Sequence, residues 1–594
     1  MSKASWSPVG PPVAIIGAGL ALAALPLVVR SDYVMFLLTQ AAVLYLVALG
    51  LNVLTGYAGI TSIGHGALVA MGAYALGITT VDHGWPFWGA MAASATVAGL
   101  CGLALALPAF RLSTWYFALI TLGFGSVVSG LVTELDWLTH GFSGVVGIPK
   151  PALFGMTLQG RSLFWLVAGA GLVAFLMTRN LIASRFGRAL LAIKESPLTA
   201  TSVGVRIGAA KIGAFIYSAV LAGIGGAFYA TNQGVITPDD FTIHFSIFFL
   251  LVIVLGGLGS LHGPLLGTAA FFLLPYLMTG LREWRLLIYA VGLLVLMIIF
   301  PQGLAGLLAL LARSFGKKAA RASPAAASAR IPLVDGARLV IEAVSKRFGG
   351  VEALADVSLT VEPGAIRGIV GPNGSGKTTL LNVVSGYHRL DNGSIRVDAT
   401  AVESVSTATL AQRGVRRTFQ TPKLVPHLSI VENVMFGAYA AERASLVAIA
   451  LGLPSARREA RLRRAEAMEF LSFVGLASHA EMPVGEATHG QQRLAEIARA
   501  LVGRPRLLLL DEPAAGLSLA ELDGLKRVIT EIAASGTTIV IVEHHLELIA
   551  DLCALITVID RGRVLKSGPP STVFADPEVL AIYMGTRALA REDA

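Results

Sequence analysis

Apolar residues crowd the chain up to about residue 312, while charged residues concentrate after it. The first part contains repeated apolar segments that each approach the roughly 20 residues a helix needs to cross a bilayer. They run at 12–30, 33–56, 58–80, 88–108, 113–134, 162–180, 209–230, 243–261, 263–281 and 285–301. The turn at 260–264 is so short that the last segments could instead be re-entrant. The pattern predicts a polytopic α-helical membrane domain of about ten spans over residues 1–312.

The second part has a different periodicity. From Leu339 onward, short apolar runs rich in β-branched residues alternate with helical stretches, as in a mainly parallel sheet surrounded by helices. Residues 428–498 are helical in pattern, which predicts a helical subdomain. Between the two parts, 313–335 is a stretch of Ala, Ser, Pro and basic residues without apolar periodicity, so we expect a basic linker there. The sequence therefore predicts a multi-domain protein that ends in an α/β P-loop domain over 336–594.

Composition agrees with a membrane part joined to a water-exposed part. Of 594 residues, 55% are hydrophobic and 14% charged, and the net charge is +9. No nucleic-acid-binding module accompanies the basic excess, so we expect no nucleic acid partner and attribute the excess to contact with the lipid bilayer. The basic connection 179–211 is placed in the cytoplasm, which puts the second domain there too. Cys101 and Cys553 offer neither a disulfide framework nor a metal cluster.

The strongest chemical signal is a glycine-rich loop between a predicted strand, 366–370, and a predicted helix. Residues 371–378 read Gly-Pro-Asn-Gly-Ser-Gly-Lys-Thr, the pattern in which backbone N–H groups surround phosphate oxygens at a helix N-terminus. Lys377 is expected to reach the terminal phosphates, and the Thr378 hydroxyl to bind Mg²⁺. The candidate nucleotide contacts are Gly371, Asn373, Gly374, Ser375, Gly376, Lys377, Thr378 and Thr379. The loop predicts binding of a nucleoside triphosphate.

Two acids follow the apolar run 507–510, which is typical of a central parallel strand. Asp511 is expected to hold Mg²⁺ through water, and Glu512 to polarise the water that attacks the γ-phosphate. His544 ends another buried strand and is expected to contact the γ-phosphate, although a lone histidine is more often structural. Gln420 is expected to coordinate both Mg²⁺ and the attacking water. These residues predict hydrolysis of the bound triphosphate.

Two further features concern the nucleotide. Phe348 precedes the phosphate loop by a short hairpin and is expected to stack on the base, the alternative being a buried core residue. A predicted helix begins with four residues whose N-terminal amides suit a γ-phosphate. They are Thr488, His489, Gly490 and Gln491.

Polar residues interrupt the apolar stretch 51–66 and suggest a broken helix beside a cavity. Asn52, Ser62 and His65 are candidates for a substrate pathway, with hydrogen bonding between helices as the alternative. In the cytoplasmic connection, 187–205 predicts a short amphipathic helix followed by a proline-marked turn. This segment either lies on the membrane surface or docks on the nucleotide-binding domain, and docking is the favoured interpretation.

These elements, in this order, resemble the ATP-binding cassette superfamily over residues 338–586. The segments similar to the branch that serves branched-chain amino acid importers are 348–354, 417–420, 490–499, 514–517 and 581–585. The first part separately resembles the permease of that system over 33–307, through the segments 51–67, 121–125, 187–205, 256–267 and 301–306. The signature differs from the usual form, because Ala487-Thr488-His489 replaces its opening Leu-Ser.

The resemblance implies ATP and Mg²⁺ as cofactors, and two facing cassettes in which residues 488–491 act on the ATP of the partner. It also implies a second permease and a second ATPase, homologous or identical, and a periplasmic substrate-binding protein. The expected location is the bacterial inner membrane, with a cytoplasmic ATPase domain. We expect a fused permease–ATPase subunit that imports branched-chain or other hydrophobic amino acids. The alternatives are import of urea, short amides or small aromatic acids, and an exporter, which the short cytoplasmic connections oppose.

Overall fold

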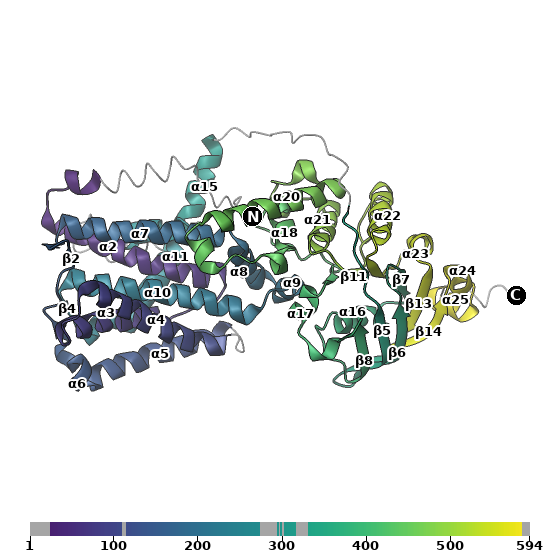
Figure 1. Cartoon of the computed structure of the whole chain (residues 1–594), viewed down its shortest axis with the longest axis horizontal. Helices are drawn as coiled ribbons and strands as arrows, with labels where there is room; N and C mark the ends of the chain where they lie inside the picture. The colour runs from purple at the N-terminus through teal and green to yellow at the C-terminus, as the bar shows by residue number, and fades with distance from the viewer. Residues whose placement is uncertain are drawn as a thin grey trace.

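The computed structural model describes residues 24–109, 114–273, 302–315 and 331–584, with short pieces between 291 and 299. Figure 1 shows an elongated molecule with a helical part at one end and a part of mixed helices and strands at the other. The helical part comes from the apolar half of the sequence and the mixed part from the polar half, as the patterns predict.

The helical part is a bundle of apolar helices. Its main elements are α2 (Asp32–Leu51), α3 (His65–Val81), α4 (Phe87–Ala109), α5 (Thr114–Glu134), α7 (Arg161–Ile182), α10 (Ile207–Gln233), α11 (Ile243–Gly257) and α12 (Gly263–Thr268). In the described residues, six helices are long and apolar enough to cross a membrane: Asp32–Tyr57, Phe87–Pro108, Trp115–Glu134, Arg161–Ile182, Ile207–Gln233 and Pro238–Gly257. Each coincides with a predicted span.

Four predicted spans have a different outcome. The segments 58–80 and 263–281 contain shorter apolar helices, His65–Val81 and Gly263–Leu273. The segments 12–30 and 285–301 lie largely outside the described residues. The number of about ten spans therefore stays a prediction.

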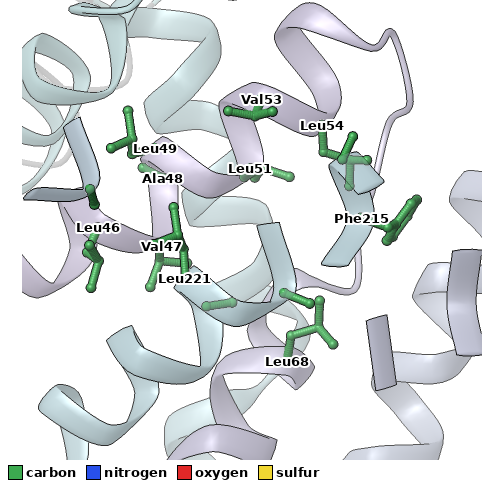
Figure 2. Packing of buried hydrophobic residues seen from close by; sticks show 14 of the residues in the cluster. Leu46, Val47, Ala48, Leu49, Leu51, Val53, Leu54, Leu68, Phe215 and Leu221 are labelled. Carbon is green, nitrogen blue, oxygen red and sulfur yellow. The ribbon is translucent and has the colours of Figure 1, made fainter. Parts of the chain in front are cut away.

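Close approach of backbones holds this bundle together around α10, which packs against α2, α3 and α4. A Cβ atom added at Gly72 would lie 2.5 Å from the Gly223 Cα, and one at Gly226 would lie 2.1 Å from the Val69 carbonyl oxygen. Figure 2 shows side chains of α2 and α10, among them Val47 and Leu221, filling the space between the ribbons. Glycine at these positions thus allows the helix backbones to approach closely.

The helix break predicted within residues 51–66 is confirmed. A buried π-helical turn, η1 (Asn52–Tyr57), extends α2, and the next helix begins only at His65. Between them, Gly59 adopts a φ of +69°, a backbone conformation that is strained for residues with a side chain.

The second part is built on a six-stranded sheet with the order β10-β11-β12-β7-β13-β14, in which only β14 is antiparallel to its neighbour. The strands are β10 (Val415–Arg417), β11 (Leu507–Asp511), β12 (Thr538–Val542), β7 (Ile366–Val370), β13 (Leu555–Asp560) and β14 (Arg563–Gly568). An antiparallel sheet adds β6 (Val351–Val361), β5 (Leu339–Phe348), β8 (Asn392–Val397) and β9 (Thr400–Ala401). The parallel order brings the carboxyl ends of β11, β12 and β7 to one edge.

A helical subdomain lies between this sheet and the membrane part, as predicted for residues 428–498 (Figure 1). Its helices are α18 (Ile430–Phe436), α19 (Leu446–Ala450), α20 (Pro454–Phe473) and α21 (His489–Val502). The fold class is therefore a polytopic helical membrane domain followed by an α/β P-loop domain with a helical subdomain.

Candidate functional site

The phosphate loop lies between β7 and α16 (Lys377–Val384), as predicted. Gly371 and Gly376 have φ values of +151° and +107°, and a Cβ at either would lie within 2.5 Å of a backbone carbonyl oxygen. These positions therefore require glycine. The Lys377 Nζ donates to the carbonyl oxygens of Gly371, at 2.9 Å, and Pro372, at 2.8 Å. Burial lowers the pKa of Lys377, while Glu512 and Asp511 oppose that shift.

Two buried oxygen atoms near this edge have no hydrogen-bond partner among the described residues: the Ser375 Oγ and the Asp511 Oδ1. An unpaired buried polar atom is costly, so such atoms point to a missing ligand. A hydroxyl in a phosphate loop suits a phosphate oxygen, and a carboxylate oxygen suits Mg²⁺ or a water on it. The residues present therefore fit a magnesium nucleotide.

Glu512 is held between two of the other predicted site residues. Its Oε2 accepts a hydrogen bond from the Gln420 Nε2 at 2.8 Å, and its Oε1 lies 2.7 Å from the His544 Nε2. Glu512 itself has a φ of +47°, an uncommon conformation for a residue with a side chain. The structure thus brings Gln420, Glu512 and His544 together at the ends of β11 and β12.

Sequence reasoning gave no role to Arg417, which is paired with Asp511. The Arg417 Nη2 lies 2.9 Å from the Asp511 Oδ2, and both side chains are buried. The same guanidinium donates to the Asn382 Oδ1 and the Ser385 Oγ. Burial raises the pKa of Asp511, and Arg417 acts against that rise. An arginine three residues before Gln420 was a visible signal, but its partner is 94 residues away in sequence.

Residues 488–491 start α21 on the helical subdomain. The Thr488 Oγ1 accepts from the Gln491 backbone N–H, and the Gln491 Oε1 accepts from the Thr488 backbone N–H. This reciprocal cap fixes the start of the helix. A Cβ at Gly490 would lie 2.2 Å from a Glu521 carboxylate oxygen. In the described chain, these four residues make no hydrogen bond to the phosphate loop, so they do not complete the site of their own chain.

A buried charged cluster on α21 holds the loop that contains Gln420. Arg493 donates to the carbonyl oxygens of Phe419 and Gln420, both at 2.5 Å. Glu496 accepts from the Lys423 backbone N–H at 3.1 Å, and Arg499 donates to the Lys423 carbonyl oxygen at 2.6 Å. The signature helix and the glutamine loop are thus joined directly, which sequence reasoning missed because the contacts cross more than 70 residues.

Phe348 lies at the end of β5 with 43% of its surface exposed. Its ring contacts His388 edge-on at 5.0 Å, and the Lys346 Nζ lies 5.4 Å from the ring centre. The alternative of a buried core residue is therefore wrong. The exposed face leaves room for a base, and stacking on adenine stays a prediction.

The connection predicted to be cytoplasmic docks on the second part, so the favoured prediction of docking is confirmed. It forms α8 (Arg185–Glu195) and α9 (Pro197–Ser202). Arg188 and Glu442 make a buried ion pair at 3.0 Å, and Arg185 donates to the Ala444 carbonyl oxygen. At the other end, Arg416 donates to the Ser202 carbonyl oxygen at 3.2 Å. Figure 1 shows α8 and α9 at the junction of the two parts.

The predicted pathway residues are buried and bonded to other parts of the bundle. The Asn52 side chain donates to the Ser260 carbonyl oxygen at 2.8 Å and accepts from the Gly259 N–H at 2.9 Å. The His65 Nε2 lies 2.9 Å from the Ser218 Oγ, and its Nδ1 lies 3.4 Å from the Ser62 Oγ. These contacts match the alternative of hydrogen bonding between helices, and a pathway role stays a prediction.

A cavity of about 430 Å³ lies elsewhere in the membrane part, at the ends of α2, α10 and α11 opposite α8. Aromatic and polar side chains share its wall. They are Phe36, Leu37, Gln40, Leu44, Tyr229, Gln233, Asp240, Thr242, His244, Phe245, Phe248 and Phe272. None of these residues was singled out from the sequence, because they come from the ends of separate helices and form no motif within any one of them.

Comparison with known proteins agrees with the geometry. Residues 354–515 match the family described as "ABC transporter", and residues 33–300 match "Branched-chain amino acid transport system / permease component". Three relatives illustrate the two halves. The high-affinity branched-chain amino acid transport ATP-binding protein BraF of Pseudomonas aeruginosa is 35% identical over 248 residues, 42% of this chain and 97% of BraF. The corresponding LivG of Escherichia coli is 34% identical over the same shares of both chains.

The permease half has its own relative. The high-affinity branched-chain amino acid transport system permease protein LivM of Salmonella typhimurium is 34% identical over 291 residues, 45% of this chain and 68% of LivM. Fold and site thus define an ATP hydrolase of the ABC transporter class joined to a membrane permease. The chain belongs to the branched-chain amino acid transport branch of that family and carries permease and ATP-binding subunit in one polypeptide.

Proposed function

We propose that this chain is one half of an ABC importer in a bacterial inner membrane, with its ATPase domain in the cytoplasm. Residues 1–312 form the permease, 313–335 the linker and 336–594 the ATPase. The observation that carries this proposal is the docking of α8 and α9 on the same domain that holds the Lys377, Asp511 and Glu512 site. Movement at the nucleotide then has a direct mechanical connection to the membrane helices.

The hydrolysis step follows from the positions of the side chains. Lys377 and the 371–378 amides would bind the phosphates, and Thr378 and Asp511 would hold Mg²⁺, which would neutralise phosphate charge. Glu512 polarises the attacking water, and its two hydrogen-bonded neighbours, Gln420 and His544, fix the direction of the carboxylate. Phe348 stacks on adenine. Thr488, His489, Gly490 and Gln491 act on the ATP of a second cassette, because they do not reach the site of their own chain.

The proposed substrates are branched-chain or other hydrophobic amino acids, delivered by a periplasmic binding protein to this chain and a second permease and ATPase. The names of the relatives support this class. The test is uptake of labelled leucine into proteoliposomes that contain the assembled transporter. Uptake should require internal Mg-ATP and an external binding protein. Uptake of urea, a short amide or an aromatic acid instead would select the alternative, and transport without any binding protein would favour an exporter.

Removal of the Lys377 charge is expected to weaken ATP binding. In Lys377→Ala, the loss of charge-assisted hydrogen bonds to phosphate should raise the dissociation constant about 10- to 100-fold. Fluorescent-nucleotide titration of the full chain measures this directly. Lys526→Ala removes an exposed lysine that pairs with Asp551 and is the matched control. Equal affinity in the Lys377 variant and the control would contradict the assigned role.

We place the outer part of the substrate route at the 430 Å³ cavity. Gln40 lines it and is 6% exposed; its Oε1 accepts from the Asn232 Nδ2, and its own amide N–H groups have no acceptor in the described part of the chain. A substrate carboxylate fits these donors, and the neighbouring Phe245 and Phe248 fit an apolar side chain.

In Gln40→Leu, one hydrogen bond to the substrate is lost, so uptake at low substrate concentration should fall about tenfold. ATP hydrolysis should persist. Gln159→Leu makes the same change at an exposed position and is the control. Unchanged uptake in a Gln40 variant that still hydrolyses ATP would exclude the cavity from the route.

A further inference from the structure

Exposed apolar side chains gather on one short segment of the helical subdomain. Leu446, Val447, Leu451 and Leu453 are 41%, 68%, 55% and 43% exposed, and we call these four the α19 patch. The adjacent Ile449 and Ala450 are buried, so the segment already uses one face for packing. A cluster of large apolar side chains on the surface of a water-exposed domain marks an interaction site.

The α19 patch lies level with the cytoplasmic ends of two membrane helices. The Asn180 Nδ2, in the last turn of α7, donates to the Ala450 carbonyl oxygen at 2.9 Å. A side chain at Gly213, in the second turn of α10, would lie 3.5 Å from Leu446. Figure 1 shows the start of α20 beside the end of α7. The patch therefore lies beside the membrane helices at the end that faces the ATPase domain.

Unpaired arginines surround the patch. Arg443, Arg457, Arg458 and Arg461 are exposed and have no acidic partner among the described residues, whereas Arg463 and Arg464 further along α20 pair with Glu466 and Glu481. The nearby Glu459 is occupied, because its carboxylate accepts from the backbone N–H groups of Arg443 and Ala444. In the segment 443–461, apolar side chains thus lie toward the ends of the membrane helices, and arginines lie around those apolar side chains.

We propose that the α19 patch inserts into the cytoplasmic leaflet and that the surrounding arginines bind anionic phospholipid headgroups. Exposed apolar side chains bordered by arginine are the composition of interfacial membrane-binding elements, and basic residues near the surface are attracted to anionic lipid. This contact goes beyond transport of any particular substrate. It gives the ATPase domain a second attachment, to lipid, beside its attachment to α8 and α9.

The test uses the full chain with Cys101 and Cys553 replaced by alanine and one new cysteine, Val447→Cys, labelled with an environment-sensitive fluorophore. Val351→Cys, 67% exposed on the antiparallel sheet, is the matched control. In vesicles of phosphatidylcholine and phosphatidylglycerol, a quencher attached to the lipid chains should quench the 447 label about threefold or more strongly than the 351 label. Aqueous iodide should show the opposite order. Retained ATP hydrolysis shows that the variants are folded.

Two outcomes would overturn the proposal. Equal access of iodide to both labels would show that the patch faces water, and protection of the 447 label from both quenchers would show that another protein subunit covers it. The charge argument has its own test, Arg457→Glu with Arg461→Glu, which should reduce lipid quenching at 447 when phosphatidylglycerol is present. Arg338→Glu, an exposed position just before β5, is the control. Unchanged quenching in the double variant would exclude the arginines from the contact.

Discussion

Glu512→Gln is expected to retain ATP binding and to lower steady-state ATP hydrolysis by about 10²- to 10³-fold. The amide keeps the size of the side chain and one acceptor oxygen, but it cannot polarise a water as a carboxylate does. In the structure, both oxygens of Glu512 are engaged, one by Gln420 and one by His544. An amide satisfies at most one of these neighbours as an acceptor, so the arrangement around the water is lost as well.

The measurement is phosphate release at saturating ATP, together with nucleotide affinity, in assemblies whose second cassette is also disabled. Glu547→Gln, an exposed position in α23 (Leu546–Leu552), makes the same chemical change outside the site and should hydrolyse ATP normally. If Glu512→Gln turned over ATP at the rate of the control, the carboxylate would not be the group that activates water. If it lost affinity instead, Glu512 would belong to binding and not to hydrolysis.

Those parts of the site that depend on local chemistry could be predicted from the sequence. The phosphate loop has its glycines and Lys377 within one stretch of eight residues, and Asp511 and Glu512 directly follow the apolar run 507–510. The parallel order of β11, β12 and β7 then brings these residues to one edge, as such sheets do. The six long membrane helices were predictable for the same reason, since span length and hydropathy are properties of a continuous segment.

Features that depend on distant partners were not predictable. The polar character of Asn52 and His65 was visible, but only the fold shows that Ser260 and Ser218 satisfy them. Arg417 was visible as well, yet its pairing with Asp511 requires β10 to lie beside β11. The membrane cavity is assembled from separate elements, none of which shows a binding motif of its own. In each case, the residue type determines which interactions a side chain can make, and the tertiary structure determines which residue it interacts with.

Breaking the buried ion pair between Arg188 of α8 and Glu442 is expected to separate ATP hydrolysis from transport. Each side chain is only 6% exposed, so removing Arg188 leaves the buried Glu442 charge with only the weaker compensation of Arg185, at a cost of up to about 3–5 kcal/mol. The Lys377, Asp511 and Glu512 site is untouched. Arg188→Met should therefore continue to hydrolyse ATP while uptake per ATP falls at least about tenfold, because α8 no longer follows the ATPase domain.

The pH dependence of this defect follows from Glu442. Burial already raises its pKa, and Arg188 opposes the rise, so the variant should have a still higher pKa. A carboxyl group whose pKa is raised in the folded protein favours folding when protonated and loses that contribution as the pH increases. The defect of Arg188→Met should consequently be smaller in mildly acidic buffer and larger in alkaline buffer.

The ratio of uptake to phosphate release in proteoliposomes measures this coupling. The exposed pair Arg338–Glu362 is the matched control, since loss of a surface ion pair costs only about 0–1 kcal/mol. The reversed pair, Arg188→Glu with Glu442→Arg, should recover part of the uptake because the charges again compensate each other. Full coupling in Arg188→Met would mean that the remaining contacts, from Arg185 and Arg416, transmit the movement without this pair.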